Sequence, residues 1–378
     1  MKEQSEIDTA QIVKDFFLGE FSFDELKYDP ENLPKGNRKE LADVVVEYGN
    51  NVIAFQIKGR ENFDNGTSED EWVKKYTDRA KNQLVDTYNQ FQNNVAPPFV
   101  NGRGDRYELK KHGIYTGIII LYNERVQEYK RVLNCRRLKG IVHCFTYKDF
   151  KNCCEKLVLP KDIMEYMSYR EKYVEMDRIC KEEEADVVDR FLVEKYGTNK
   201  FDPDELYIFR WFLNNYKDRL EDGNRKQYRE IIEVFLELDR VGVDAFSRRL
   251  GKFISLAKKS VNSDNSYIVP GNKELSSFLF LSADSGSKLI EYIEKMTYLF
   301  MYKTKSHKCL TVVAYFDAVE SFRLDWIFIE LPWEYDEKLE EMCNLPEIRK
   351  LWNPQLILTG KIVSSQMKNS KIFVRDLA

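Results

Sequence analysis

The sequence predicts an α/β protein in which a mixed sheet flanked by helices is followed by a helical region and a small C-terminal α/β unit. Three observations support this class. Apolar residues with helical spacing alternate with short apolar runs in the first part of the chain. A long middle stretch has helical spacing alone, and strand patterns return near the C-terminus. With 378 residues, 43% of them hydrophobic, the chain is long enough for about two or three domains.

The first predicted domain, residues 1–175, contains the alternating elements. They follow the order helix, hairpin, helix, strand, helix, strand, and a helical segment closes the domain. The second helix is long and amphipathic, and a Gly-, Asn- and Asp-rich loop precedes it. The clearest elements are a helix at 7–18, a hairpin at 40–60, a helix at 70–92, strands at 113–122 and 140–147, and helices within 149–176.

The rest of the chain is predicted to form two further domains. Residues 176–262 have helical spacing throughout, most clearly at 204–220 and 227–259. A Ser-, Asn- and Asp-rich stretch then marks a boundary. Residues 263–378 follow with the order strand, helix, strand, strand, which indicates a small α/β unit. We expect this unit to have a regulatory or interaction role.

The composition indicates a cytoplasmic protein. The N-terminus lacks the basic start and apolar core of a signal peptide, and no apolar run approaches the ~20 residues of a membrane span. We therefore expect no membrane contact. The seven cysteines form no CxxC pair, so we interpret them as reduced thiols and expect no zinc site.

The predicted hairpin at 40–60 carries polar residues inside its strands. Gly49 and Asn50 are suited to a two-residue primed turn, which would place Asp43 directly opposite Gln56. Directly opposed residues point to the same face, and Lys58 shares that face through the two-residue period of a strand. The alternate apolar residues of the second strand then face a core: Ile53, Phe55 and Ile57.

Two interpretations fit this polar face. A carboxylate, an amide oxygen and an ammonium at one end of a hairpin can hold a hard divalent cation beside a water molecule. Alternatively, Asp43 and Lys58 form a structural pair on a half-buried strand.

The motif Glu40-Leu-Ala-Asp43 followed by Phe55-Gln56-Ile57-Lys58 resembles the active-site signature of the PD-(D/E)xK, or restriction-endonuclease-like, superfamily. In this variant, Gln replaces the second acid. Residues 21–40 resemble the lead-in of bacterial nucleases from antiphage systems, and residues 80–91 resemble the helix that packs beside the site. Residues 159–173 are similar to the end of such domains, so that the resemblance covers residues 1–175.

The resemblance implies a Mg2+-dependent DNA endonuclease, with Mn2+ as an alternative ion, acting in bacterial antiphage defence. It implies that Asp43, the side-chain oxygen of Gln56 and the Ile57 carbonyl bind the metal. Glu40 would act through water or as a further ligand. Lys58 would orient the attacking water and stabilise charge in the transition state. Two accessory residues follow by the same analogy: Gln83 and Glu20.

Two other classes of function stay open. A nuclease-like fold could bind nucleic acid without cutting it, or it could be a structural subunit of a defence complex. Residues 101–151 carry twelve Lys or Arg against five acids, which is compatible with phosphate contact or with a solvated surface balanced by the acidic stretch 175–189. Aromatic-rich helices at 204–220 and 288–303 indicate a protein partner or self-association, or fill the cores of their own domains.

Overall fold

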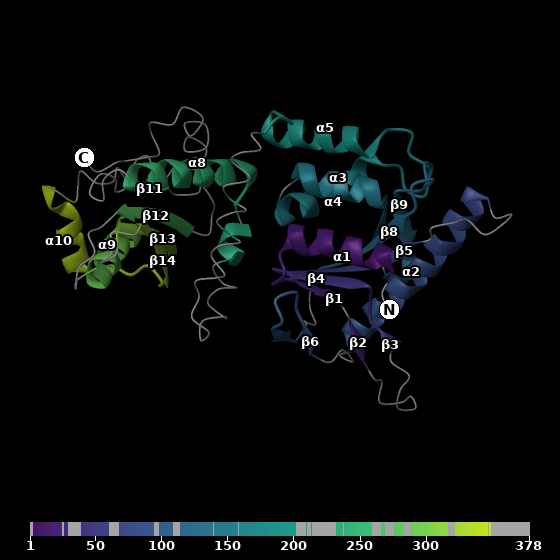
Figure 1. Cartoon of the computed structure of the whole chain (residues 1–378), viewed down its shortest axis with the longest axis horizontal. Coiled ribbons are helices and arrows are strands. Elements are labelled where there is room, and N and C mark those ends of the chain that lie inside the picture. Colours follow the sequence, from purple (N-terminus) through teal and green to yellow (C-terminus); the bar gives the residue numbers. More distant parts are fainter. Residues whose placement is uncertain are drawn as a thin grey trace. The chain divides into compact units, whose positions relative to one another are not determined.

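The computed structural model of the chain is shown in Figure 1. It divides into two compact units, Met1–Phe201 and Asp202–Ala378. No helix in the described ranges is long and apolar enough to cross a membrane. The structure describes residues 3–24, 26–28, 39–59, 68–93, 98–108, 114–138, 140–157, 159–201, 209, 213, 232–236, 238–258, 266–268, 276–282, 289–316, 322–346 and 348.

The first unit is built around a six-stranded mixed sheet with the strand order β1-β4-β5-β8-β10-β9. The two central pairs, β5 with β8 and β8 with β10, are parallel, and the outer pairs are antiparallel. The strands are β1 (Ser22–Asp24), β4 (Val44–Tyr48), β5 (Asn51–Gly59), β8 (Ile114–Tyr122), β9 (Val132–Cys135) and β10 (Gly140–Thr146). Two short hairpins flank this sheet: β2 (Lys27–Tyr28) with β3 (Lys39–Glu40), and β6 (Phe99–Val100) with β7 (Arg106–Tyr107). The predicted mixed sheet is therefore present.

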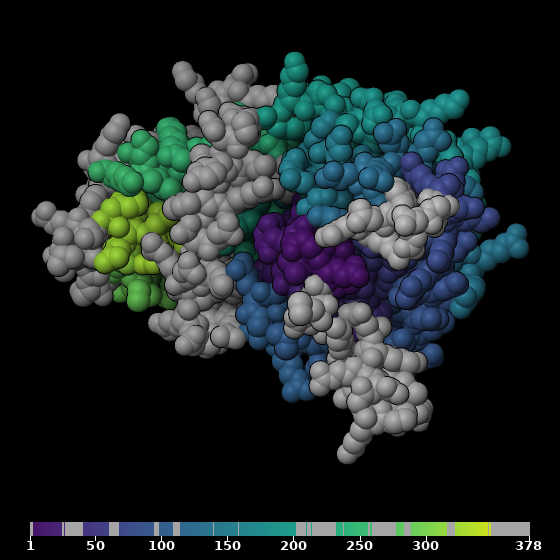
Figure 2. Space-filling view, turned by 45° about the vertical axis from the view of Figure 1, so that its right-hand side comes forward, coloured from purple at the N-terminus to yellow at the C-terminus, as the bar shows by residue number. Residues whose placement is uncertain are grey.

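Helices cover both faces of this sheet. The helices are α1 (Gln4–Phe17), α2 (Glu69–Asn93), α3 (Tyr147–Leu157), α4 (Pro160–Tyr173) and α5 (Glu184–Tyr196). On one face, Phe55 of β5 lies between Phe17 of α1 and Phe150 of α3. Its neighbour Ala54 points the other way, into the core that Leu84 of α2 shares. Figure 2 shows the exposed side of α1 in purple, bordered by the blue-green surface of later helices of this unit.

The hairpin of β4 and β5 has the predicted register. Tyr48 pairs with Asn51, and the ladder ends where Val44 pairs with Phe55. Asp43 directly precedes Val44, beyond this last pair, and its carboxylate accepts a hydrogen bond from the amide of Ile57. Gly49 has a φ of 56°, as the first central residue of a primed turn requires. The turn therefore fixes which side chains share a face.

The connection between β8 and β10 differs from the prediction. We expected a helix there, but residues 132–135 form the edge strand β9, and one 3-10 turn, η1 (Arg136–Leu138), follows it. Val132 and Leu133 are buried in this strand, because they pair with His143 and Val142 of β10. An adjacent antiparallel strand thus buries an apolar run that sequence spacing alone assigns to a helix.

Each outer strand of the sheet is contacted by another segment of the unit on its free edge. Beside β1, the amide of Gly102 donates to the carbonyl of Ser22 at 2.9 Å. Beside β9, the amide of Asp177 donates to the carbonyl of Val132 at 2.8 Å, and Lys130 forms an antiparallel bridge with Ile179. Short segments of the same unit therefore use hydrogen-bonding groups that an open edge would expose.

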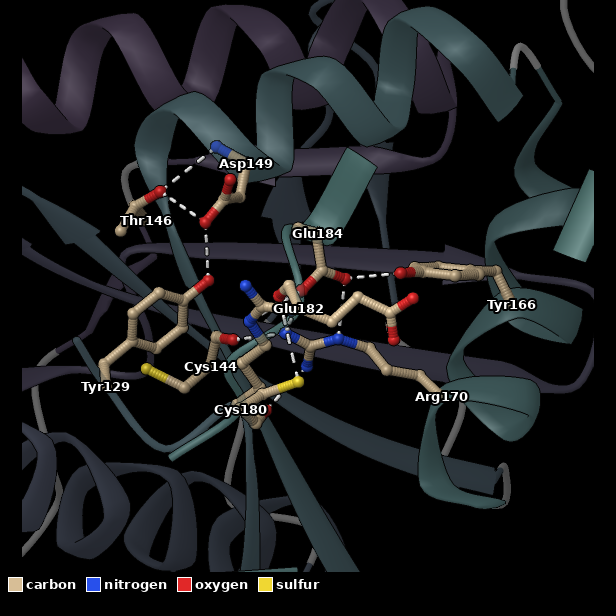
Figure 3. Close-up of polar contacts among 10 residues, drawn as sticks. Tyr129, Cys144, Thr146, Asp149, Tyr166, Arg170, Cys180, Glu182 and Glu184 are labelled. Atoms are coloured by element: carbon tan, nitrogen blue, oxygen red, sulfur yellow. Dashed lines mark hydrogen bonds and ion pairs between the residues drawn. The ribbon is translucent and has the colours of Figure 1, made fainter. Parts of the chain in front are cut away.

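A buried ion pair fastens α4 and α5 to the sheet (Figure 3). The guanidinium of Arg170 is fully buried and donates to both carboxylate oxygens of Glu184, at 2.8 and 2.9 Å. It also donates to the carbonyls of Arg131 and Cys144, at 2.6 and 2.8 Å. Burial opposes ionisation of Glu184, but the charges of Arg170 and Arg131 and the hydrogen bonds from Arg170 and Tyr166 outweigh it and lower the pKa of Glu184.

This pair bears on where the first unit ends. We predicted a boundary at residue 175, whereas the first compact unit extends to Phe201. Glu184, at the start of α5, pairs with Arg170 of α4, and Asp189 of α5 pairs with Lys156 of α3 at 2.7 Å. A fragment ending near residue 175 would leave the buried Arg170 without its carboxylate.

The second unit is a small four-stranded sheet between helices. Its strand order is β11-β12-β13-β14, with the β12–β13 pair parallel and the other pairs antiparallel. The predicted order strand, helix, strand, strand corresponds to β12, α9, β13 and β14. The elements are α8 (Arg240–Ala257), β11 (Ser266–Ile268), β12 (Ser276–Ser282), α9 (Leu289–Thr304), β13 (Lys308–Phe316), β14 (Phe322–Glu330) and α10 (Glu337–Asn344). Phe246 of α8 packs on Phe278 of β12, whereas Leu279 faces the core shared with α9.

Aromatic residues of α9 mainly fill the core of their own unit. Phe300 and Tyr302 are buried, and Tyr292 packs against the same core. Tyr298 is 40% exposed and is available for contact with another molecule. The other aromatic-rich stretch, 204–220, lies outside the described residues except for Phe209 and Leu213. For α9, packing within the unit therefore explains most of the aromatic content.

We predict that Glu184→Gln destabilises the first unit by about 3 kcal/mol, because it leaves the buried Arg170 charge uncompensated. Urea unfolding at pH 7 checks this. The pKa of Glu184 is lower in the folded chain than its ordinary value of 4.5, so its contribution is present above that pH and is lost as the pH falls through the folded value. The free energy of unfolding should therefore fall less on acidification in Glu184→Gln than in the wild-type chain.

The matched control is Glu175→Gln, which breaks a surface pair with Arg178 in which both side chains are more than half exposed. Such pairs contribute little to stability. Equal destabilisation by the two substitutions would contradict the role assigned to the buried pair.

Candidate functional site

The candidate site lies at the end of β5, the strand between β4 and β8. Residues Val52 to Ile57 of β5 are all buried, because helices cover both faces of the sheet. Lys58 and Gly59, the last two residues of β5, are only partly buried, although they still pair with β8. The polar side chains of β5 therefore gather where the strand meets solvent.

The structure brings Asp43, Gln56, Ile57 and Lys58 together. The ammonium of Lys58 donates to Oε1 of Gln56 and to the carbonyl oxygen of Ile57, both at 3.1 Å. It also lies 3.8 Å from Oδ2 of Asp43. Three oxygens predicted to be metal ligands thus converge on one positive charge.

The site is largely shielded from water. The side chains of Lys58 and Asp43 are 11% and 9% exposed, and Gln56 is 3% exposed. Interactions between charges are stronger in such a position than at an open surface. The group is therefore suited to holding a cation or a phosphate oxygen.

A hydrogen bond holds Asp43 against the neighbouring strand. The amide of Ile57 donates to Oδ2 of Asp43 at 2.5 Å. Asp43 lies in a bend directly before β4, where the regular ladder with β5 has ended. The carboxylate takes the place of a ladder carbonyl and is thereby oriented toward Lys58.

Thr87 fastens the segment before Asp43 to helix α2. Its hydroxyl donates to the carbonyl of Leu41, two residues before Asp43, and also contacts the carbonyl of Gln83 at 2.9 Å. Sequence reasoning missed this residue, because a threonine on the apolar side of a helix has no distinguishing pattern. The feature of the sequence that could have identified Thr87 is its position on the predicted buried face of this helix.

Helix α1 is packed closely against the end of β5. Gly59 allows this approach, because a Cβ atom at this position would lie 2.3 Å from Oγ and 2.6 Å from Cβ of Ser5. Tyr122, which pairs with Gly59 across β5 and β8, donates a hydrogen bond to Oδ2 of Asp8 at 2.6 Å. This hydrogen bond raises the pKa of Tyr122 to about 12 and lowers the pKa of Asp8. The backbone next to Lys58 is therefore supported from the side of α1.

The other predicted site residues have different positions. Glu40 belongs to β3, and its side chain lies outside what the structure describes. Oε1 of Gln83 is buried and has no hydrogen-bond partner among the described residues. Gln83 lies one helical turn from Thr87 in α2, the helix whose core contacts include Ala54 of β5.

Glu20 is not brought to this site. It lies just before β1, whose residue Ser22 pairs with Val46, so that Glu20 is near the turn end of the hairpin. Asp43 is at the opposite end of β4, about 15 Å away at the usual rise of a strand. Glu20 is 2% exposed and pairs with Arg103 at 2.5 Å.

Several basic residues of segment 101–151 are paired with other residues of the same unit. Arg131 is 6% exposed and pairs with Glu184 at 3.3 Å, which removes it from contact with phosphate. Arg103 pairs with the buried Glu20, and Arg137 donates to Asn82 at 3.1 Å. The exposed basic residues of the described segment are Arg106, Arg125, Lys130, Arg136, Arg137, Lys148 and Lys151.

The donor set at the end of β5 fits a hard cation better than a soft one. Among residues that the structure describes, no group of three His, Cys, Asp or Glu side chains is placed to hold a metal. At this site one carboxylate, one amide oxygen and one carbonyl oxygen are available instead. Oxygen ligands of this kind suit Mg2+, which often binds few carboxylates and takes further ligands from water or phosphate.

Comparisons with known proteins add little to this geometry. No family model and no curated protein matches the chain. Among solved structures, the chain is similar to the small subunit of a heterodimeric restriction endonuclease, with a TM-score of 0.25 and 12% identity. The match covers 51% of this chain and 89% of that subunit. Inferences about function therefore depend on the site itself.

We predict that Gly59→Ala lowers the melting temperature, because the added methyl group would overlap Ser5 and push α1 away from β5. The Ser5→Gly change removes both overlapping atoms and should restore most of the loss in the double variant. Thermal unfolding of the two single variants and the double variant measures this coupling. Additive effects of the two changes would show that the close contact does not limit packing here.

Proposed function

We propose that the chain is a metal-dependent DNA endonuclease of the PD-(D/E)xK type, in the variant with Gln at the second acidic position. One observation carries the proposal. The three oxygens of Asp43, Gln56 and Ile57 converge on the Lys58 ammonium at the end of a central strand. The motif and its register on one hairpin support it further.

The metal would be Mg2+, with Mn2+ as an alternative. Asp43, Oε1 of Gln56 and the carbonyl of Ile57 would hold it, and Glu40 would add a ligand directly or through water. When bound, such an ion polarises a scissile phosphate and lowers the pKa of a coordinated water. Asp43 is positioned for this task by the amide of Ile57, so that its carboxylate needs little reorganisation.

Lys58 supplies a positive charge beside the same oxygens. Its ammonium can hydrogen-bond the attacking water and stabilise negative charge that develops on the phosphate. Because its side chain is 11% exposed, this charge is weakly screened by solvent. Gln83 remains an accessory candidate, since its buried Oε1 is available for a hydrogen bond. Glu20 is set aside because it lies at the other end of the hairpin.

DNA is the proposed substrate, and bacterial antiphage defence is the proposed setting. The exposed basic residues, such as Lys130, Arg136 and Lys148, are available for phosphate contacts. The setting depends on the resemblance of residues 21–40 to nucleases of such systems, and the second unit would control the enzyme through a protein partner or self-association. Tyr298 is one exposed aromatic residue in that unit.

The test is cleavage of supercoiled DNA, linear DNA and RNA in Mg2+, with EDTA as the metal-free arm. We predict that Asp43→Ala and Lys58→Ala each lower cleavage by at least about a hundredfold, because Asp43 would hold the metal ion and Lys58 would stabilise negative charge at the phosphate. Circular dichroism should show that both variants stay folded, since the site lies at the end of the strand. Full activity in either folded variant would refute the site.

Two exposed residues of α2 provide matched controls: Lys74→Ala and Asp78→Ala. These variants should cleave as the wild-type chain does. A wild-type chain that binds DNA tightly but leaves all three substrates intact would favour a nucleic-acid-binding module instead.

A separate prediction concerns the neutral ligand. We expect Gln56→Glu to retain or raise Mg2+-dependent cleavage, because a carboxylate binds a hard cation more strongly than an amide does. The new carboxylate would keep the contact with Lys58, whose ammonium lies 3.1 Å from Oε1. Initial cleavage rates across a Mg2+ titration measure the effect. A folded but inactive variant would show that a neutral ligand is required here.

A further inference from the structure

We propose that Lys58 acts as an internal cation that occupies the ion position, so that a divalent metal and a nucleic-acid phosphate enter the site together. This inference deepens the proposed function and rests on it. It concerns how the site is loaded, which the nuclease assignment leaves unspecified.

The position of the Lys58 ammonium carries the inference. It accepts no hydrogen bond, and it donates to Gln56 Oε1 and Ile57 O at 3.1 Å while lying 3.8 Å from Asp43 Oδ2. These are the oxygens that would hold the metal. The ammonium therefore provides for these oxygens the positive charge that a metal ion would otherwise provide.

A metal ion and this ammonium exclude each other at the observed position. Mg2+ binds oxygen at about 2.0–2.1 Å. An ion at that distance from Gln56 and Ile57 would lie within about 4 Å of the ammonium, where like charges in a shielded site repel strongly. Lys58 must therefore move when the ion binds.

A phosphodiester gives the displaced ammonium a new partner. The Lys58 side chain has a flexible stem, and the next residue, Gly59, is the last residue of the strand. A phosphate oxygen at the site would attract the ammonium away from the three oxygens and would complete the metal's own ligand set. Metal and DNA should then bind cooperatively, and by thermodynamic linkage each raises the affinity of the other by the same factor.

The experiment is a titration of the full chain with Mn2+, followed by electron paramagnetic resonance of the free ion. It compares the wild-type chain with Lys58→Met, with and without a short phosphorothioate duplex that resists cleavage. We expect Lys58→Met to bind Mn2+ about tenfold more tightly without DNA, a factor typical of coupling between neighbouring sites. The duplex should raise the wild-type affinity by a similar factor and that of the variant by much less.

Three further variants make the result specific. Lys58→Arg retains the positive charge and should bind Mn2+ within about threefold of the wild type. Lys74→Met, on the exposed side of α2, should leave the affinity unchanged. Asp43→Asn in the Lys58→Met background should remove the tight binding of Mn2+. This loss would show that the ion binds at the oxygens of Asp43, Gln56 and Ile57. Circular dichroism confirms that each variant is folded.

The outcomes separate this inference from the proposed function. If the wild type binds Mn2+ and Lys58→Met binds it equally or more weakly, the internal-cation role is overturned and the metal site stands. If neither the wild type nor Lys58→Met binds Mn2+, with or without the duplex, both proposals are overturned.

Discussion

The burial of β5 on both faces and along both edges is the constraint on which the first unit depends. Strand β5 pairs antiparallel with β4 and parallel with β8, and helices cover both of its faces. Only apolar side chains satisfy such a position through most of its length. Beyond Asn51 at the turn, polar side chains of β5 are therefore confined to its last residues, at Gln56 and Lys58. The same packing that stabilises the unit thus determines where its candidate site lies.

The candidate site is held by backbone groups as much as by side chains. Asp43 is fixed by the amide of Ile57, and Thr87 holds the chain two residues before it. On the other side, Ser5 contacts Gly59 closely enough to exclude a larger residue there. Three elements, α1, α2 and β4, therefore support one short stretch of β5. Such support lowers the reorganisation that charged groups need when they bind a ligand.

Local signals in the sequence allowed part of this arrangement to be predicted. Gly49 and Asn50 specify the turn, and the observed register of the hairpin, from Tyr48–Asn51 to Val44–Phe55, is the predicted one. Contacts between distant residues have no such signal. Glu184 belongs to an acidic run that is typical of a solvated surface, yet it is 1% exposed, because Arg170 pairs with it across α4 and α5. The predicted helix before β10 was wrong for a similar reason, since pairing with β10 determines the conformation of β9.

The covered edges of the six-stranded sheet restrict how this protein associates with others. Gly102 closes the side of β1, and the segment around Asp177 closes the side of β9. Another chain cannot extend the sheet by adding a strand at these places without first displacing those segments. The covered edges also protect the unit from edge-to-edge aggregation at high concentration. Side chains on helices and loops can contact another protein without such a displacement, so they offer the less costly route to association.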